Sequence, residues 1–393
     1  MADLGFRAFD ADQHYYEAED AFIRHVPRSM RKRCMQWAIV DGKKRLLVGG
    51  RINRFIPNPT FDPVARPGSL DDYFRGRNPE GKDVAELFGD LEPIRAAYRD
   101  RDARLALLDQ QGIEACFLFP TLGVGMEEAL KHDPEAVTTA FGAFNRWLEE
   151  DWGTCYRDRL FAAPYITLVD PEWAEAELRR VLERDARVVC LRAGPVAHPH
   201  GSRSPADPRH DRFWALANEA GITVAFHAGD SGTTEYAEKW GEGGEMEAFR
   251  YRPLRQCLSI SPIRDTLAAM ICHGLFDRHR NLRVATIESG SSWVAPLLAS
   301  LRKAFGQMPR AFRRDPVESF LGHVYVSPYY EDDLEGLRNL IGADHMLFGS
   351  DFPHAEGLAD PTDFVYDLKG FGDDEIRQVM RENGLALTRR RPA

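Results

Sequence analysis

Long apolar runs and clustered positive charge are both missing from this 393-residue sequence. No stretch of about 18 apolar residues occurs, so we expect no membrane-spanning helix. The formal net charge is −10 and basic runs are short, such as Arg389–Arg391, which argues against a nucleic-acid partner because phosphate contacts need clustered cations. The first twenty residues are acidic where an export signal would be apolar, so we expect neither an export signal nor a transit peptide.

Paired cysteine motifs are also missing. The six cysteines lie at positions 34, 116, 155, 190, 257 and 272, and no two of them form a C-x-x-C pair. In a large chain without an export signal, such cysteines are expected to be buried, reduced thiols rather than disulfides or a zinc cluster. We therefore expect a cytoplasmic protein.

What the sequence does contain is a regular alternation of short apolar segments with helical segments. The predicted strands are Phe6–Asp10, Glu114–Phe119, Phe161–Leu168, Arg187–Leu191, Thr223–His227, Arg283–Ile287, His323–Val326 and Met346–Gly349. Each is rich in Val, Ile, Phe or Leu, as strands buried on both faces are. Asp170 followed by Pro171 is typical of a helix start, an N-cap with proline at the first helical position. Strand–helix alternation of this kind predicts βαβ units and a parallel sheet.

Eight such strands predict a closed (β/α)8 barrel of the TIM type, forming a single domain over residues 1–393. A doubly wound open sheet is the competing fold. No G-x-G-x-x-G motif follows the first predicted strand, which removes the main support for a dinucleotide-binding sheet.

The longest interruption of the alternation is residues 30–95, between the first two predicted strands. Within it, Gln36–Val40 and Arg45–Val48 flank Asp41-Gly42, a strong hairpin signal. Loops that follow barrel strands lie at the active-site face, so we interpret residues 30–95 as a cover over that face. A dimer arm and a purely structural insertion are the alternatives.

Polar side chains stand at the ends of several predicted strands, where barrels of this type build their active sites. They are Asp10, Asp12 and His14 after the first strand, Arg192 after the fourth, His227 at the fifth, Glu288 after the sixth and Asp351 after the eighth. Asp12 and His14 are two residues apart, so both can point inward. Imidazoles and carboxylates converging at one mouth are costly unless they bind a cation. Nitrogen and oxygen ligands without thiolate suit zinc, iron(II) or manganese.

Several segments resemble the amidohydrolase-related proteins grouped with aminocarboxymuconate-semialdehyde decarboxylase and γ-resorcylate decarboxylase. The resemblance lies in Asp10–Glu17 (D-A-D-Q-H-Y-Y-E), Asp102–Pro120, Phe226–Gly232 (F-H-A-G-D-S-G), Gly274–Trp293 and Phe348–Gly357 (F-G-S-D-F-P-H-A-E-G). Together these segments span nearly the whole chain in the order of the family.

The resemblance implies a metal site. Asp12 and His14 fall on the two ligand positions of the first strand, His227 on the fifth-strand histidine and Asp351 on the eighth-strand aspartate. We expect a divalent ion, zinc in the first place, with iron and manganese as alternatives. One ion per chain is the default and two are the alternative. Homodimers are common in the family, so a homodimer is expected as well.

The sixth strand departs from the family pattern. Decarboxylases of this group carry a catalytic histidine there, whereas this sequence has Glu288. Glu288 is predicted to act as a base or to bind a second metal ion, and an ion pair with Arg192 is its structural alternative. No lysine follows the fourth strand, so the commonest two-metal site of the superfamily is not supported.

The remaining candidates concern the substrate. We assign Arg192, as a clamp for a carboxylate, and His354 to substrate binding, with Glu17 also near the mouth. Aromatic residues beside the ligand positions, Tyr15, Tyr16 and Phe352, suggest an apolar or aromatic substrate, although core packing explains them as well. His198, His200 and His210 are expected to lie in a solvated loop.

Three functions are compatible with this sequence. The first is hydrolysis by metal-activated water of an amide, ester, thioester or lactone of a small apolar or aromatic carboxylic substrate, with Asp351 as general acid–base and Glu288 as a second base. The alternative is non-oxidative decarboxylation, or another C–C cleavage, of an aromatic or unsaturated acid, with Asp351 protonating carbon. The third, a non-catalytic barrel, predicts missing ligands, whereas all of them are present.

Overall fold

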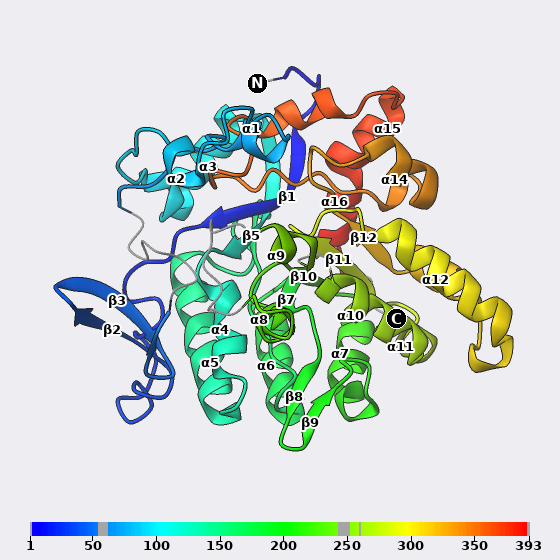
Figure 1. The fold of residues 1–393 in the computed structure, drawn as a ribbon, viewed down its shortest axis with the longest axis horizontal. Helices are drawn as coiled ribbons and strands as arrows, with labels where there is room; N and C mark the ends of the chain where they lie inside the picture. Colours follow the sequence, from blue (N-terminus) through cyan, green and yellow to red (C-terminus); the bar gives the residue numbers. More distant parts are fainter. Residues whose placement is uncertain (1, 54–61, 243–251, 259–260, 391–393) are drawn as a thin grey trace.

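The computed structural model describes residues 2–53, 62–242, 252–258 and 261–390. At its centre is the predicted (β/α)8 barrel (Figure 1). The barrel strands are β1 (Ala8–Tyr15), β5 (Ile113–Pro120), β6 (Leu160–Ala162), β7 (Val188–Arg192), β10 (Thr223–His227), β11 (Arg283–Ile287) and β12 (Val324–Val326). All neighbouring pairs among them are parallel, as expected for strands joined by crossover helices.

The strands form two arcs, β1-β5-β6 and β7-β10-β11-β12. On one side, an isolated parallel bridge between Tyr165 and Cys190 joins the arcs. The strand predicted over Phe161–Leu168 is therefore shorter than expected: β6 ends at Ala162, and Tyr165 alone continues the pairing.

On the other side, residues 346–348 take the place of the eighth strand. Met346 bridges Val326 of β12, and the Phe348 carbonyl accepts a 2.8 Å hydrogen bond from Ala11 N of β1. Residues 346–349 thus do not form the regular strand predicted for them. Their place in the barrel is nevertheless as predicted.

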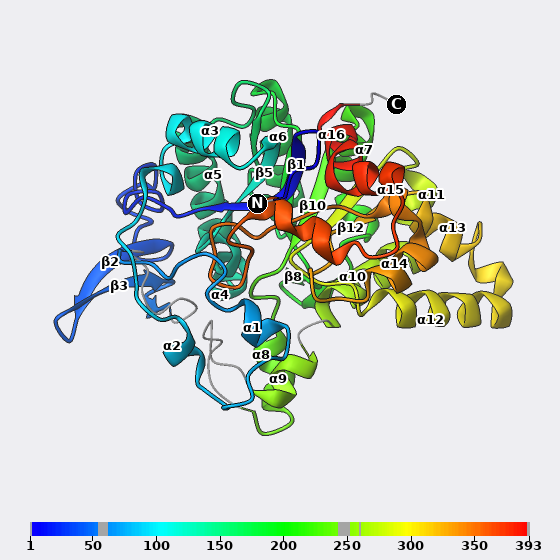
Figure 2. The ribbon, with the colours of Figure 1, turned by 90° about the horizontal axis from the view of Figure 1, so that it is seen from above.

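Helices surround the strands (Figures 1 and 2). The longer ones are α3 (Arg101–Gln110), α5 (Pro134–Asp151), α6 (Pro171–Glu183), α7 (Asp211–Ala220), α10 (Ser261–Cys272), α12 (Val294–Gln307) and α14 (Leu334–Ile341). The shorter ones include α4 (Met126–Leu130), α8 (Thr233–Glu238), α9 (Pro253–Leu258), α11 (Leu275–Arg278), α13 (Pro316–Leu321), α15 (Asp373–Arg377) and α16 (Asn383–Thr388), the last preceded by the π-helical turn η7 (Gln378–Glu382).

Local signals explain where these helices begin and end. Asp170 caps α6 as predicted, because its side chain accepts hydrogen bonds from the amides of Glu172 and Trp173. Gly221 ends α7 in the left-handed conformation, with φ of 58°. Apolar side chains of both helices are buried against the barrel, and this burial fixes the outer layer.

The first part of the insertion is a small antiparallel sheet, β2 (Met35–Val40), β3 (Lys43–Val48) and β4 (Arg51–Ile52). The predicted hairpin turn is confirmed, since Asp41 and Gly42 both have positive φ, 50° and 73°, as a type I′ turn requires. This sheet projects from one side of the barrel (Figure 1).

The later part of the insertion contains α1 (Asp71–Phe74) and α2 (Val84–Leu87) and lies against the loop after the eighth strand position. Leu70 N donates a 2.9 Å hydrogen bond to the Ala355 carbonyl, and Gly68 N donates one of 3.4 Å to the His354 carbonyl. Leu70 and Ala355 also share a small apolar cluster. The roles of cover and dimer arm stay predictions.

Within the described residues, none of the helices is long and apolar enough to cross a membrane. The cysteines are free, and Cys34, Cys116 and Cys190 are buried as expected. The expectation of burial is wrong for Cys257 and Cys272, which are exposed on α9 and α10.

Packing of α16 against β1 generates a stability prediction. A Cβ on Gly384 would overlap the Phe9 ring, so Gly384→Ala should lower the free energy of unfolding by about 1–3 kcal/mol. Gly306→Ala is the matched control: it is exposed in α12 with nothing within 4 Å of its Cβ, and alanine should stabilise that helix by about 0.5–1 kcal/mol. Urea unfolding of both variants measures the difference, and equal effects would contradict close packing at Gly384.

Candidate metal centre

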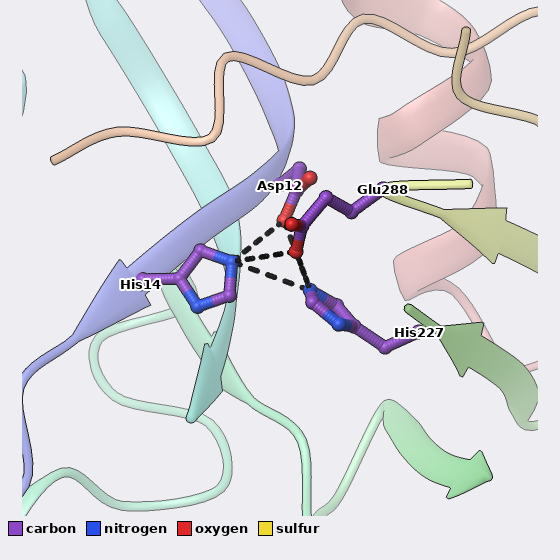
Figure 3. Close-up of side chains that lie close together, drawn as sticks. All are labelled: Asp12, His14, His227 and Glu288. Atoms are coloured by element: carbon purple, nitrogen blue, oxygen red, sulfur yellow. Dashed lines mark hydrogen bonds and ion pairs between the residues drawn. The ribbon is translucent and has the colours of Figure 1, made fainter. Parts of the chain in front are cut away.

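β1 extends further than the sequence indicated, so Asp12 and His14 lie inside the strand rather than after it. The predicted strand end at Asp10 is wrong because β1 continues to pair with β5 beyond that residue. Between Asp10 and Gln13 the register shifts by one extra residue on β1, as in a bulge. Asp12 and His14 still point to the same space at the barrel mouth, as expected (Figure 3).

Backbone carbonyls orient the two imidazoles of the site. His14 Nδ1 lies 3.1 Å from the Pro120 carbonyl oxygen, and His227 Nδ1 lies 2.7 Å from that of Ala228. A carbonyl oxygen only accepts, so each Nδ1 carries a hydrogen. In a neutral ring the lone pair is then on Nε2. The two Nε2 atoms are 3.2 Å apart, so two lone pairs face each other unless a proton or a metal cation lies between or beside them.

Carboxylate oxygens complete this group. Asp12 Oδ1 lies 3.3 Å from His14 Nε2 and 3.5 Å from His227 Nε2, and Glu288 Oε2 lies 3.7 and 3.3 Å from the same atoms (Figure 3). Asp12 Oδ1 is buried and has no hydrogen-bond partner. An unpaired buried carboxylate oxygen aimed at two imidazole lone pairs fits a divalent cation, for which nitrogen and oxygen are ordinary ligands.

Asp351 lies beside this group. Its Oδ1 is 3.3 Å from His14 Nε2, so Asp351 is brought to the site as predicted. The group of four whose ligand atoms all lie within 4.8 Å of one another, however, consists of Asp12, His14, His227 and Glu288. Asp351 instead belongs to two adjoining clusters, one with His14 and His354 and the other with Glu288 and Glu356.

Asp351, His354 and Thr121 form a hydrogen-bonded chain. Thr121 Oγ1 donates to the Tyr15 carbonyl at 2.9 Å, so its single hydrogen is used there. His354 Nε2, 3.0 Å from Thr121 Oγ1, must therefore be the donor in that contact. His354 Nδ1 is 2.7 Å from Asp351 Oδ1, and one further proton is needed between these atoms.

Burial and neighbouring charges shift the pKa of the site residues in different directions. Burial raises the pKa of Glu288 well above its usual value, and the neighbouring Asp351 raises it further. Burial also raises the pKa of Asp351. Burial lowers the pKa of His14 to about 3. Burial also lowers the pKa of His227, but the nearby carboxylates of Asp12 and Glu288 outweigh burial and raise this pKa. A divalent ion would supply the positive charge that a proton otherwise provides.

Two carboxylates of the site sit on strained backbone. Glu288 and Asp351 have φ of 48° and 56°, which costs a residue with a Cβ roughly 1–2 kcal/mol. The Tyr329 hydroxyl donates a 2.8 Å hydrogen bond to the Glu288 carbonyl, and Asp351 N donates one of 2.9 Å to the Asp12 carbonyl. Strain held in place by such contacts is common at functional sites.

Arg192 lies at the end of β7 but is already paired. Its Nη1 is 3.2 Å from Glu128, its Nε is 3.9 Å from Glu127, and its Nη2 donates to the Pro195 carbonyl at 2.7 Å. The alternative ion pair with Glu288 is therefore wrong: within the described chain the carboxylate partners of Arg192 come from α4. Its role as a substrate clamp stays a prediction.

The aromatic residues named from the sequence divide into two groups. Tyr15 is fully buried and stacks on Trp152, and Phe352 is buried against Tyr98, so both serve the core. Tyr16 does border the site, with its ring 5.9 Å from that of His354.

The histidine-rich loop after β7 is separate from the site. His200 is exposed as expected for a solvated loop, and His198 is partly buried. For His210 the expectation is wrong, because its side chain is buried at the start of α7.

Some site residues were not identified from the sequence. Thr121 directly follows β5, and inspection of that strand end would have found it. Glu356 follows His354 within the same recognised motif. Glu127 and Glu128 carry no such signal, since they lie on α4 and reach Arg192 and Thr167 through contacts distant in sequence.

Comparison with known proteins identifies the class. The family described as Amidohydrolase matches residues 92–389, so the chain belongs to this family and the resemblance drawn from its motifs is confirmed. None of the curated proteins matches the chain.

Among solved structures, an amidohydrolase from Mycobacterium avium subsp. paratuberculosis K-10 is 45% identical, with a TM-score of 0.93, covering 98% of this chain and 100% of that one. A 2,6-dihydroxybenzoate decarboxylase from Rhizobium shares the fold at 19% identity and a TM-score of 0.54, covering 83% of this chain and 96% of its own. The 5-carboxyvanillate decarboxylase of Sphingomonas paucimobilis does so at 15% identity and 0.59, covering 98% and 100%.

Metal content tests the centre directly. Wild-type protein purified without a histidine tag should contain about one divalent ion per chain by elemental mass spectrometry, and His227→Ala should lose most of it because one of the two imidazole ligands is gone. His200→Ala, an exposed histidine outside the site, is the matched control and should keep the wild-type content. No metal in the wild type, even after reconstitution with zinc, iron and manganese, would refute the centre.

Proposed function

We propose that the chain is a metal-dependent carboxy-lyase that removes CO2 from a small aromatic or unsaturated acid without an oxidant. The observation that carries the proposal is the proton required between Asp351 and His354, beside a group of buried metal-ligand atoms. Proteins of the same fold include decarboxylases of 2,6-dihydroxybenzoate and 5-carboxyvanillate, which supports this reaction over others.

Asp12, His14 and His227 would hold the ion, with Glu288 or Asp351 as a further ligand. When bound, a divalent ion would neutralise and orient the substrate carboxylate and polarise a neighbouring oxygen. A dihydroxybenzoic acid decarboxylase of the same fold from Polaromonas sp. JS666 contains manganese, so manganese is the first ion to test, followed by zinc and iron(II).

The residues of the chain supply the proton chemistry. Asp351, hydrogen-bonded to His354, transfers the proton of the pair to the carbon that bears the carboxylate. The C–C bond then breaks, its electron pair returns to the ring or double bond, and CO2 leaves. A solvent proton restores the Asp351–His354 pair. The imidazole of His354 packs against that of His14, with ring centroids 4.0 Å apart. This packing keeps the His354 ring in the site, beside Asp351.

Hydrolysis is the second candidate, and Glu288 is the observation that favours it. Its Oε2 lies 3.3 Å from His227 Nε2, at the strand end where related decarboxylases carry histidine. A carboxylate there can take a proton from an attacking water, as general bases do in amide, ester, thioester or lactone hydrolysis. Both candidate reactions act on a small-molecule substrate. We also propose that the protein is a homodimer.

The two candidates differ in their products. Manganese-loaded and zinc-loaded protein should release CO2 from at least one member of a panel of hydroxybenzoic and unsaturated acids, measured by mass spectrometry of the headspace. Asp351→Asn should lower kcat about 10²–10⁴-fold because the proton donor is lost. Asp344→Asn, an exposed aspartate away from the mouth, should not change it. CO2 release that persists in Asp351→Asn would contradict the assigned role.

Glu288 separates the candidates further. If the reaction is hydrolysis, the product acid carries 18O from labelled water, and Glu288→Gln should slow its formation about 10²–10⁴-fold. If the reaction is decarboxylation, no 18O enters the organic product, and Glu288→His, which restores the histidine of related decarboxylases, should retain CO2 release. Loss of CO2 release in Glu288→His together with 18O incorporation by the wild type would overturn the carboxy-lyase proposal.

A further inference from the structure

The end of β5 holds two histidines of the mouth through adjacent residues. Pro120 accepts from His14 Nδ1 through its carbonyl, and Thr121 contacts His354 Nε2 through its hydroxyl. Thr121 is buried, with 6% of its surface exposed, so solvent is a poor substitute for this hydroxyl. Two adjacent residues at the end of β5 therefore orient two imidazoles: that of His14, a candidate metal ligand, and that of His354, which contacts Asp351.

The position of Thr121 is itself fixed. One carboxylate oxygen of buried Glu17 accepts hydrogen bonds of 2.9 Å from the amides of Leu122 and Gly123, the two residues after Thr121. The turn is tight, because a Cβ on Gly123 would come within 2.8 Å of the Pro120 side chain. The Thr121 hydroxyl is thus presented to His354 by a rigid turn.

The directions of the hydrogen bonds determine which nitrogen of His354 carries a proton. The Thr121 hydrogen points to the Tyr15 carbonyl, so Thr121 can only accept from His354, and the proton on His354 Nε2 is fixed. His354 Nδ1 is thereby directed at Asp351 Oδ1, 2.7 Å away. Without the hydroxyl, Nε2–H loses a buried acceptor, and the ring is free to rotate or to change tautomer.

We propose that Thr121 is a positioning residue: it fixes the orientation and tautomer of His354 and, through that ring, places Asp351 for proton transfer. The part that concerns proton transfer rests on the proposed function. The assignment of the His354 tautomer is independent of that function, because it concerns only which ring nitrogen carries the hydrogen. Partners one step from a reacting group commonly change activity 10–100-fold when removed.

The test compares Thr121→Val, which keeps the shape and removes the hydroxyl, with Thr121→Ser, which keeps the hydroxyl. Long-range 1H–15N spectra of histidine-labelled, zinc-loaded protein report which nitrogen of His354 is protonated, and the signal is assigned by its loss in His354→Gln. We expect Nε2–H in the wild type and in Thr121→Ser and a changed pattern in Thr121→Val. Metal content should be the same in all three, and Thr121→Val should melt at a somewhat lower temperature because the Tyr15 carbonyl and His354 Nε2–H lose a buried partner.

Turnover provides the second readout once a substrate is known. Thr121→Val should lower kcat about 10–100-fold with little change in KM, and Thr121→Ser should recover most of it. If no substrate is turned over, the proposed function fails while the nitrogen spectra still decide on the tautomer. An Nε2 without hydrogen in the wild type, or identical spectra for Thr121→Val and the wild type, would overturn the proposal. Equal loss of kcat in both variants would overturn its catalytic part.

Discussion

Two imidazole nitrogens facing each other at 3.2 Å are the constraint on which the arrangement of the barrel mouth depends. Neither ring of His14 and His227 can turn away, because each donates its other nitrogen's hydrogen to a backbone carbonyl. Buried carboxylates around two lone pairs are unstable without a cation. We therefore expect folding of the barrel and binding of a cation to be linked, because the strands bring the ligand atoms together and an ion would offset their repulsion.

Buried polar residues behind the site hold in place the segments that carry its charged side chains. Arg104 is fully buried on α3 and donates hydrogen bonds to the His14 carbonyl and to Gln13. Asp10, also buried, accepts from Ser350 and Gln13 and so ties β1 to the segment that carries Asp351. The first and eighth strand positions are thus joined by these side-chain contacts as well as by backbone hydrogen bonds, from Ala11 N to the Phe348 carbonyl, from Asp351 N to the Asp12 carbonyl and from His14 N to the Phe352 carbonyl. This compensates for the irregular eighth strand.

Much of the site follows from one rule, that barrel enzymes use residues at the carboxyl ends of strands. The rule found His14, His227, Glu288 and Asp351 because each belongs to a strand whose apolar pattern is visible in the sequence. It gave no sign of the ion pair that Arg192 forms, because its partner Glu128 comes from the short helix α4, distant from Arg192 in sequence. It also misjudged β1, because polar residues inside a strand with a bulge look like the start of a loop.

Exposure of the side chains shows from which side a substrate reaches the centre. Asp12, His14 and His227 keep 4%, 1% and 0% of their side-chain surface, whereas Glu288 and Asp351 keep 24% and 13%. The histidines and Asp12 therefore form the floor of the site, and the other two carboxylates form its solvent side. We therefore expect a substrate to approach the floor from the side of Glu288 and Asp351. The carboxylates to which we assign proton transfer, Asp351 in decarboxylation and Glu288 in hydrolysis, are thus the two of these five groups that are most exposed to solvent.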